Sequence, residues 1–553
     1  MKSFLLSLSL LCSISFCSGR YDERNILIKQ RIDSLDCIVP LSYKESKLKE
    51  RKYTIIVKTQ EDFDNLNDKL TQALQDGQNN IEIKLGSGIF LFNENHIERK
   101  NEHRKDVYIQ LTGNNTIIAS KGYNEDISEA SAYEDICYAN DLLEVVDIKN
   151  NLCFIPFKNN IKDSLKHNYT KVQVTQWFEA PIYDVKSIDA IGIYFEAIGL
   201  KKTLKGYSIN NDYNYMGQRP RFRLYNVSKE DKCWASCFLN MANCEYAGFI
   251  ISKITFRSNK GTYPLIRVSE LHSKLLKISQ CTFENIKGRV SQIITSDNVI
   301  IDKNSFINTY GYEINIGGGS APVRVTDNRF KKCGLKLGNT ICVTCSEAEY
   351  YIAGNTFVDF GYCAIGVGLW HGHKKKHLSK GIVEHNEMYY TPSYFNNKEK
   401  YTLMDGGAIY AWTQNDDVII RYNYIHDYTG MGDNRGIFCD DGASNIKIYG
   451  NVILNVPNSY CIDSRRIKDY ENGFENNANN FVAHNIIEGS VRLQGYNKNG
   501  RHTLKGANYV LRKEVNNSLN NKFDNLEFEE EDIVVLNKNS KLIRNQIKKC
   551  MRR

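Results

Sequence analysis

The sequence lacks three features that would point to common alternative architectures. Beyond residue 19 no run of 18 consecutive apolar residues occurs, so we expect no membrane span. The second half has no long runs with the 3.6-residue period of a helix, which argues against a helical solenoid. Basic and acidic residues nearly balance, 72 against 64, and no basic-aromatic motif of a nucleic-acid module occurs. We therefore expect no nucleic-acid partner.

The first 19 residues have the pattern of a secretory signal. Lys2 supplies the positive charge, and the apolar stretch from Phe4 to Phe16 is too short to span a bilayer. The sequence therefore predicts a secreted or periplasmic protein. Cys17 leaves a lipid-anchored cell-surface form open, although Phe16 departs from the small residue usual before such a cysteine.

Sixteen cysteines occur, two of them within the signal. In an exported protein the other fourteen can form a disulfide framework, or they can be small buried hydrophobic residues in a large core. The spacing of Cys342 and Cys345 suits either a disulfide or a metal ligand pair, as does that of Cys233, Cys237 and Cys244. We predict no metal site.

A repeat of Asn, any residue, then an apolar residue dominates the second half. It begins at Asn304, Asn328, Asn355, Asn386, Asn423, Asn451 and Asn485. Short alternating strands, a minimum spacing of 24 residues and loops of variable length are typical of a parallel β-helix. We expect the Asn side chains to stack at one corner of successive coils and to adopt the left-handed conformation of the bend. We also expect Phe306, Phe330 and Phe357 to stack in the interior, with Phe256 and Phe283 as earlier turns.

The fold class predicted is all-β, a right-handed parallel β-helix (solenoid) with an inserted β-sandwich-like domain. Helical spacing of Phe63, Leu66, Leu70 and Leu74 indicates a cap over the open first coil. The predicted units are a signal peptide, a cap with the first coils, an inserted and mostly antiparallel β domain, the main β-helix and a C-terminal cover segment. They span residues 1–19, 20–123, 124–245, 246–500 and 501–553, respectively.

The segments "NIEIKLGSGIF" and "DGGAIYAW", the Asn-x-apolar coils and "GIFCDDGASNIKIYGNVI" resemble pectate-lyase-like right-handed β-helix proteins. Within that superfamily the chain looks most like bacterial β-helix glycoside hydrolases of families 141 and 120. The resemblance covers most of residues 50–500. It implies an exported carbohydrate-active enzyme with acidic catalytic residues on adjacent coils.

Aligning the coils by their Asn corners places an acidic cluster on one outward strip. The alignment pairs Ile409 with Ile437, Tyr410 with Phe438 and Trp412 with Asp440. Because strand side chains alternate, the column Ile365/Ile409/Ile437/Ile462 should point inward and the columns containing Tyr410 and Trp412 outward. We predict Asp405, Asp440 and Asp441 as catalytic candidates, with Asp440 the best placed because strands disfavour Asp. Asp441 and Asp405 can equally serve as turn residues.

The predicted substrate contacts are Trp412, which would stack a sugar ring, and five polar residues near it: His371, His373, Arg435, Asp463 and Arg465. The arginines can instead balance the charge of the aspartates, and Asp463 can be a salt-bridge partner. Two carboxylates on nearby coils fit glycoside hydrolysis of a polysaccharide or oligosaccharide by an exported, monomeric enzyme without cofactor. The alternatives are a polysaccharide lyase acting on a uronate, with a Ca²⁺ requirement, and a non-catalytic glycan-binding β-helix.

Overall fold

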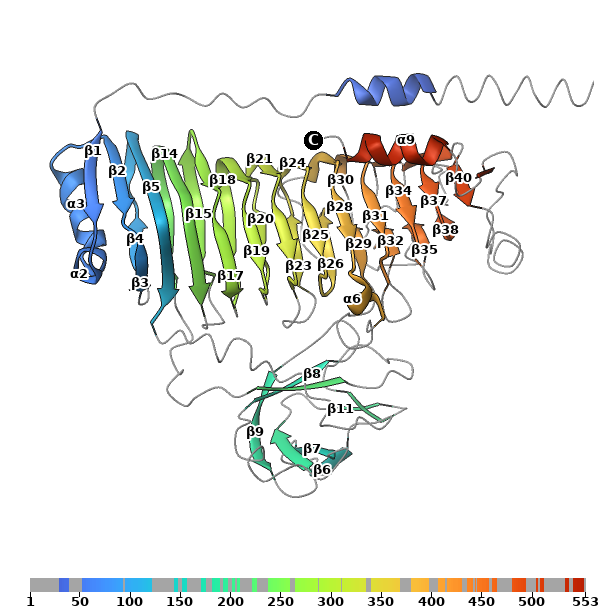
Figure 1. Ribbon diagram of the computed structural model, residues 1–553, viewed down its shortest axis with the longest axis horizontal. Helices are drawn as coiled ribbons and strands as arrows, with labels where there is room; N and C mark the ends of the chain where they lie inside the picture. Colours follow the sequence, from blue (N-terminus) through green and yellow to red (C-terminus); the bar gives the residue numbers. More distant parts are fainter. Residues whose placement is uncertain are drawn as a thin grey trace, which may run out of the picture.

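The chain winds into a stack of β coils along one axis, with parallel pairing between successive coils (Figure 1). The parallel β-helix predicted from the repeat is thereby confirmed. The computed structural model describes residues 29–38, 52–92, 95–121, 144–147, 152–156, 171–175, 182–188, 192–196, 201–203, 206–208, 221–225, 237–258, 264–286, 288–309, 311–334, 340–368, 379–396, 406–412, 415–429, 435–440, 443, 445–456, 460–464, 480–493, 504–505, 508–511, 533–536 and 541–551.

Each coil contributes strands to three faces, which we number in chain order. Face 1 contains β4 Ile97–Lys100, β15 Ile266–Ser273, β20 Ile314–Gly317, β23 Ile341–Cys345, β26 Cys363–Val367, β29 Gly407–Ala411, β32 Arg435–Cys439, β35 Tyr460–Ser464 and β38 Ser490–Leu493. Face 2 contains β1 Tyr53–Val57, β2 Asn80–Leu85, β16 Leu276–Ser279, β21 Ala321–Thr326, β24 Glu349–Ala353, β27 Ser379–Glu384, β30 Asn415–Arg421, β33 Ile446–Tyr449, β36 Phe481–Ala483 and β39 Leu504–Lys505. Face 3 contains β3 Gly88–Phe92, β17 Thr282–Ile286, β19 Ser305–Ile307, β22 Arg329–Lys331, β25 Thr356–Val358, β28 Glu387–Tyr389, β31 Tyr424–His426, β34 Val452–Leu454, β37 Ile486–Ile487, β40 Asn508–Leu511 and β41 Ile533–Leu536. Three long strands bend across more than one face: β5 His103–Ser120, β14 Leu239–Ser258 and β18 Ser291–Asp302.

The Asn ladder lies buried at the corner between faces 2 and 3. Asn328 shows the pattern: its Oδ1 accepts hydrogen bonds from the backbone N–H of Asn304 at 2.9 Å and from Nδ2 of Asn304 at 3.0 Å. Its own Nδ2 donates to the carbonyl of Ile301 on the preceding coil at 2.9 Å. The same links continue through Asn355, Asn386, Asn423, Asn451 and Asn485. The stacking predicted from the sequence is therefore confirmed.

The left-handed residue of this bend is not the Asn itself, so that part of the prediction is wrong. Positive φ angles occur at the residue just before each ladder Asn: Lys303, Asp327, Gly354, His385, Tyr422, Gly450 and His484. The Asn side chain must point into the corner to reach its two neighbours. The preceding residue, whose side chain is not held there, therefore adopts the conformation that turns the chain.

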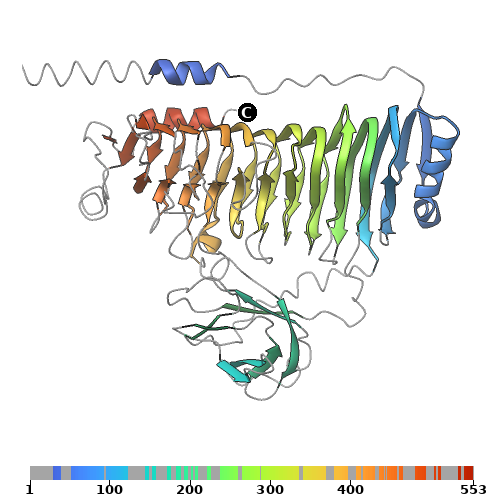
Figure 2. The same cartoon turned by 180° about the vertical axis from the view of Figure 1, so that it is seen from behind.

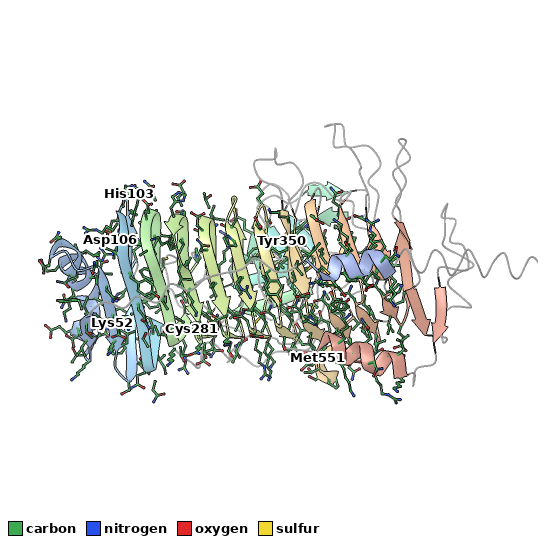
Figure 3. All side chains as sticks on the ribbon, turned by 90° about the horizontal axis from the view of Figure 1, so that it is seen from above. Lys52, His103, Asp106, Cys281, Tyr350 and Met551 are labelled. Atoms are coloured by element: carbon green, nitrogen blue, oxygen red, sulfur yellow. The ribbon has the colours of Figure 1, made fainter. Side chains whose placement is uncertain are left out.

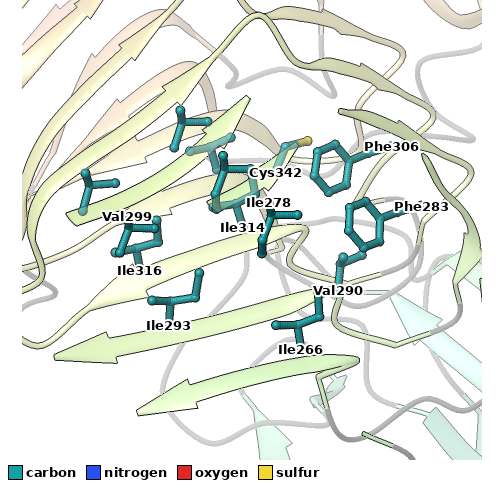
Figure 4. Close-up of a cluster of buried hydrophobic side chains, with 14 of the residues drawn as sticks. Ile266, Ile278, Phe283, Val290, Ile293, Val299, Phe306, Ile314, Ile316 and Cys342 are labelled. Atoms are coloured by element: carbon teal, nitrogen blue, oxygen red, sulfur yellow. The ribbon is translucent and has the colours of Figure 1, made fainter. Parts of the chain in front are cut away.

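Aromatic rings fill the interior beside this corner. Phe256, Phe283, Phe306, Phe330 and Phe357 stack with ring centroids 4.5 to 5.2 Å apart. Figure 4 shows two of them, Phe283 and Phe306. Such pairs contribute about 0.5–1.5 kcal/mol each beyond the apolar area they bury. The predicted Phe ladder, with its two earlier turns, is confirmed.

Two helices cover the open first coil, as the helical spacing predicts. They are α2 Gln60–Asp64, which begins with a capping box at Thr59, and α3 Leu66–Gln75. The chain segment that connects β5 to β14 forms a separate antiparallel sheet with the strand order β13-β8-β9-β10-β7-β6. It also forms a hairpin of β11 and β12. These strands are β6 Glu144–Asp147, β7 Leu152–Pro156, β8 Lys171–Thr175, β9 Ile182–Ile188, β10 Gly192–Glu196, β11 Lys201–Thr203, β12 Gly206–Ser208 and β13 Arg221–Tyr225.

Helices also lie on the outside of the last coils. The helix of residues 29–36 and α9 Lys541–Cys550 both pack on the outer side of face 2 and its corner with face 3 (Figures 1 and 2). The short α6 Pro392–Asn396 follows β28. In the part of the chain that the structure describes, no helix combines the length and apolar character needed to cross a membrane.

Candidate functional site

The face-1 strands β26, β29, β32 and β35 carry the predicted acidic strip, in the predicted register. Ile409 pairs with Ile365 on one side and Ile437 on the other, and Ile437 pairs with Ile462. These isoleucines are fully buried in the solenoid interior. Tyr410 pairs with Phe438, and Phe438 with Asp463, on the outward side.

The outward side of these strands is covered by aromatic rings. Tyr410, Trp412 and Phe438 form a cluster with Ile341, Tyr362 and Cys363 that is distinct from the solenoid interior. The Tyr410 ring meets Phe438 edge-on at a centroid distance of 4.8 Å and Trp412 at 5.0 Å. Large rings on adjacent coils thus bury one another instead of standing open to solvent.

Trp412 does not offer the open ring face expected of a sugar-stacking residue. Its exposed fraction is 4%, and its ring lies directly over Gly366, where an added Cβ would come within 2.8 Å of the indole. The prediction assumed that an outward column is an exposed column. Packing across the glycine on the neighbouring coil removes that exposure.

Asp440 is the predicted acid that reaches the surface among the described residues. It follows β32 directly, and its side chain is half-buried. Its Oδ2 accepts a hydrogen bond from the Tyr410 hydroxyl at 2.7 Å, while its backbone N–H donates to the carbonyl of Ala411 at 2.9 Å. The neighbouring coil therefore holds both the carboxylate and the backbone of Asp440. The register prediction put Tyr410 on the outward column but did not reveal this hydrogen bond.

Arg435 and Asp463 form a fully buried ion pair beneath the aromatic cluster. Arg435 Nε donates to Asp463 Oδ2 at 2.9 Å, and both side chains have no exposed area. The guanidinium also lies over the Phe438 ring, 4.0 Å from its centroid. The predicted contact of either residue with a substrate is therefore wrong. Arg435 instead balances the charge of Asp463, because an unpaired charge in the interior would be strongly unfavourable.

Asp463 is also poorly placed as the second carboxylate. Asp440 lies one residue beyond the Cys439–Ser464 pair, so the two aspartates are on adjacent strands and two positions out of step. Strand geometry then separates their backbones by about 8 Å. The ion pair with Arg435 also holds Asp463 away from any substrate.

Five predicted site residues lie outside the described residues: Asp405, Asp441, His371, His373 and Arg465. Within the described ranges, no group of three or more His, Cys, Asp or Glu side chains is placed to hold a metal ion. Twelve cysteines lie in these ranges, and all but Cys37 are buried.

A row of polar side chains extends the Tyr410 column toward the first coils. Asn240, Arg267, Gln292, Asn315 and Thr344 pair in sequence on face 1, and Thr344 pairs through Gly366 with Tyr410. Arg267 is exposed, and Gln292 and Asn315 are partly so. Successive coils space these side chains roughly 4.8 Å apart along the axis. Single-residue motif searches miss this row, because it exists only across coils.

No protein-family model and no curated protein matches this sequence. Among solved structures, the chain is similar to PfbA, a surface adhesin of Streptococcus pneumoniae, with 12% identity over 82% of this chain and 83% of that chain and a TM-score of 0.36. It is also similar to the tailspike protein gp49 from Pseudomonas phage LKA1, with 11% identity over 80% and 70% and a TM-score of 0.19. The parallel β-helix of this chain is defined by its own strand pairing.

Proposed function

We propose that this protein is an exported glycoside hydrolase that cleaves a glycosidic bond of a polysaccharide on the outer side of face 1. The observation that carries the proposal is the half-buried Asp440 carboxylate, held by the Tyr410 hydroxyl at 2.7 Å on an adjacent coil. A carboxylate that is fixed and still accessible is the group such a reaction needs.

Asp440 acts in its ionised form, as the base toward water or as the nucleophile. The hydrogen bond from Tyr410 supports this role, because a donated hydrogen bond to a charged acceptor is stronger than one to a neutral acceptor. A second acid protonates the leaving oxygen as the glycosidic C–O bond breaks. Asp405, two residues before β29, and Asp441, next to Asp440, are the sequence candidates for that acid.

The polar row on face 1 is the reason to propose a polysaccharide. Arg267, Gln292 and Asn315 are at least partly exposed, lie in line with Tyr410 and follow the solenoid axis. Amide and guanidinium groups at regular spacing can donate hydrogen bonds to the hydroxyl and carboxylate groups of a linear glycan. A short oligosaccharide would need only the coils near Asp440.

A reducing-sugar screen on a polysaccharide panel tests the proposal. The wild-type protein is compared with Asp440→Asn and with a matched control, Asp297→Asn, whose exposed carboxylate pairs with His272. We expect Asp440→Asn to abolish release of reducing ends and the control to retain it. A product absorbing near 235 nm would identify a lyase instead, and glycan binding without turnover by the wild-type protein would identify a non-catalytic β-helix.

A further inference from the structure

Residues 29–38 dock on the outer side of face 2, far along the solenoid from the coil that follows them in the chain. Figure 3 views this side, with the helix of residues 29–36 in blue and α9, which ends near Met551, in red. Leu35 is buried in one hydrophobic cluster with Ile419, Tyr449 and other apolar side chains of β27, β30, β33, β36 and α9. On the same side of the helix, the Arg31 guanidinium lies 4.8 Å from the Phe481 ring centroid.

Arg421 on β30 binds the C-terminal end of this helix. Its Nη1 donates to the carbonyl of Leu35 at 2.8 Å, and its Nη2 to the carbonyl of Ile38 at 3.4 Å. Its Nε pairs with Glu384, and both side chains are at least nine-tenths buried. A buried guanidinium facing the last carbonyls of a helix favours the helix through hydrogen bonds and through the helix dipole. Without the helix, two nitrogens of Arg421 would lose these acceptors.

Asp36 is recognised by groups from three separate elements. Its carboxylate accepts hydrogen bonds from the hydroxyls of Tyr422 at 2.6 Å and Tyr449 at 3.1 Å. Lys549 of α9 lies 3.7 Å from the same carboxylate. Asp33, about one turn earlier in the helix, is exposed and makes none of these contacts.

The distance between the two ends explains why this contact is unusual. Nine strand spacings on face 2 separate β1 from β30, which is about 43 Å along the axis. Fifteen residue steps lead from Ile38 to Tyr53, and a fully extended chain of that length reaches about 50–54 Å. The connection is long enough with little excess. An eight-residue helix is also too short to be stable alone in water, so its formation depends on the docking site.

We propose that residues 29–38 are an internal peptide ligand of a binding site around Arg421, Tyr422 and Tyr449, and that they bind there without needing their connection to Tyr53. The site takes a short amphipathic helix with Leu and Asp in its last turn. The strands β30, β33 and β36 belong to the same three coils as Tyr410, Asp440 and Asp463. The docked helix therefore packs on face 2 of the coils that carry these residues on face 1. This inference does not rest on the proposed hydrolase activity.

The test uses the full chain with a protease recognition sequence substituted within residues 39–51. After cleavage, native size exclusion followed by mass spectrometry shows whether the N-terminal fragment stays with the solenoid. We expect it to stay and Asp36→Ala to weaken its retention about tenfold to a hundredfold. The substitution removes two hydroxyl contacts to a charged acceptor and the ion pairs with Arg421 and Lys549. The matched Asp33→Ala should match the wild type. Immediate loss of the wild-type fragment, or equal retention in the two variants, would overturn the proposal.

Two further variants of the uncut chain address the span and the coils. Deleting eight of the residues between 39 and 51 leaves a reach of about 25 Å, too short for docking within one molecule. The hydrogen-exchange rate of residues 415–429 and 445–456 should then rise, and we expect a similar rise in Asp36→Ala. Inserting eight Gly/Ser residues into the same segment should leave the exchange rate unchanged. Unchanged exchange in both the deletion and Asp36→Ala would show that the segment does not hold these coils.

Discussion

Glu313 gives the sharpest stability prediction, because its carboxyl group is fully buried just before β20. Burial raises its pKa from 4.5 to about 8, although hydrogen bonds from Thr309 Oγ1 at 2.6 Å and from the backbone N–H of Gly334 at 3.2 Å act in the opposite direction. Since the folded-state pKa is the higher one, the folded protein keeps the proton. Its stabilising contribution is complete below about pH 4.5 and is lost as the pH rises through about 8.

The magnitude follows from the two pKa values. The difference between 4.5 and about 8 corresponds to about 5 kcal/mol of destabilisation at alkaline pH, as an upper value. Glu313→Gln resembles the protonated acid and cannot ionise. We expect its urea unfolding midpoint to be close to that of the wild type at pH 5 and clearly higher at pH 9.

The difference between variant and wild-type midpoints, measured at pH 5, 7 and 9, isolates this group from the other titrating residues. Glu270→Gln is the matched control, because Glu270 is exposed on face 1. A Glu313→Gln difference that stays constant with pH, or that matches the control, would refute the argument that burial keeps the acid protonated.

Three other substitutions test separate parts of the structure. Asn328→Ala leaves several buried backbone and amide groups of the ladder without partners and should cost roughly 3–5 kcal/mol by chemical denaturation. Asn315→Ala, on the partly exposed side of β20, should cost far less, and similar costs would contradict the role of the ladder. Arg435→Met should destabilise the protein by about 3–5 kcal/mol because it leaves the buried Asp463 carboxylate unpaired. Adding Asp463→Leu should restore much of that stability in thermal unfolding. A double variant no more stable than Arg435→Met would argue against the ion pair. Tyr410→Phe should lower kcat about tenfold to a hundredfold with little change in the unfolding midpoint, because it removes the hydrogen bond to the Asp440 carboxylate. Full activity of this variant would contradict a role of Tyr410 in holding that carboxylate.

The coil register could be predicted because it depends on a local repeat. Each Asn corner fixes the phase of the strands around it, so counting back from Asn423 and Asn451 paired Ile409 with Ile437 correctly. Alternation then separated inward from outward side chains.

Exposure on the outward side could not be predicted in the same way. Trp412 is buried because Gly366 on the neighbouring coil leaves room for its ring, and Arg435 because Asp463 lies one coil further along. The docking of residues 29–38 has no periodic signal at all, since Arg421 and Leu35 are 386 positions apart in the chain. Only the folded solenoid brings those groups together.

The most direct test of the central claim measures turnover and glycan affinity separately for Asp440→Asn on the polysaccharide that the wild-type protein degrades best. We predict that turnover is lost while affinity and the unfolding midpoint stay close to the wild-type values, since the carboxylate is replaced by an amide of the same shape. Turnover that survives the substitution would show that the chemistry does not depend on Asp440.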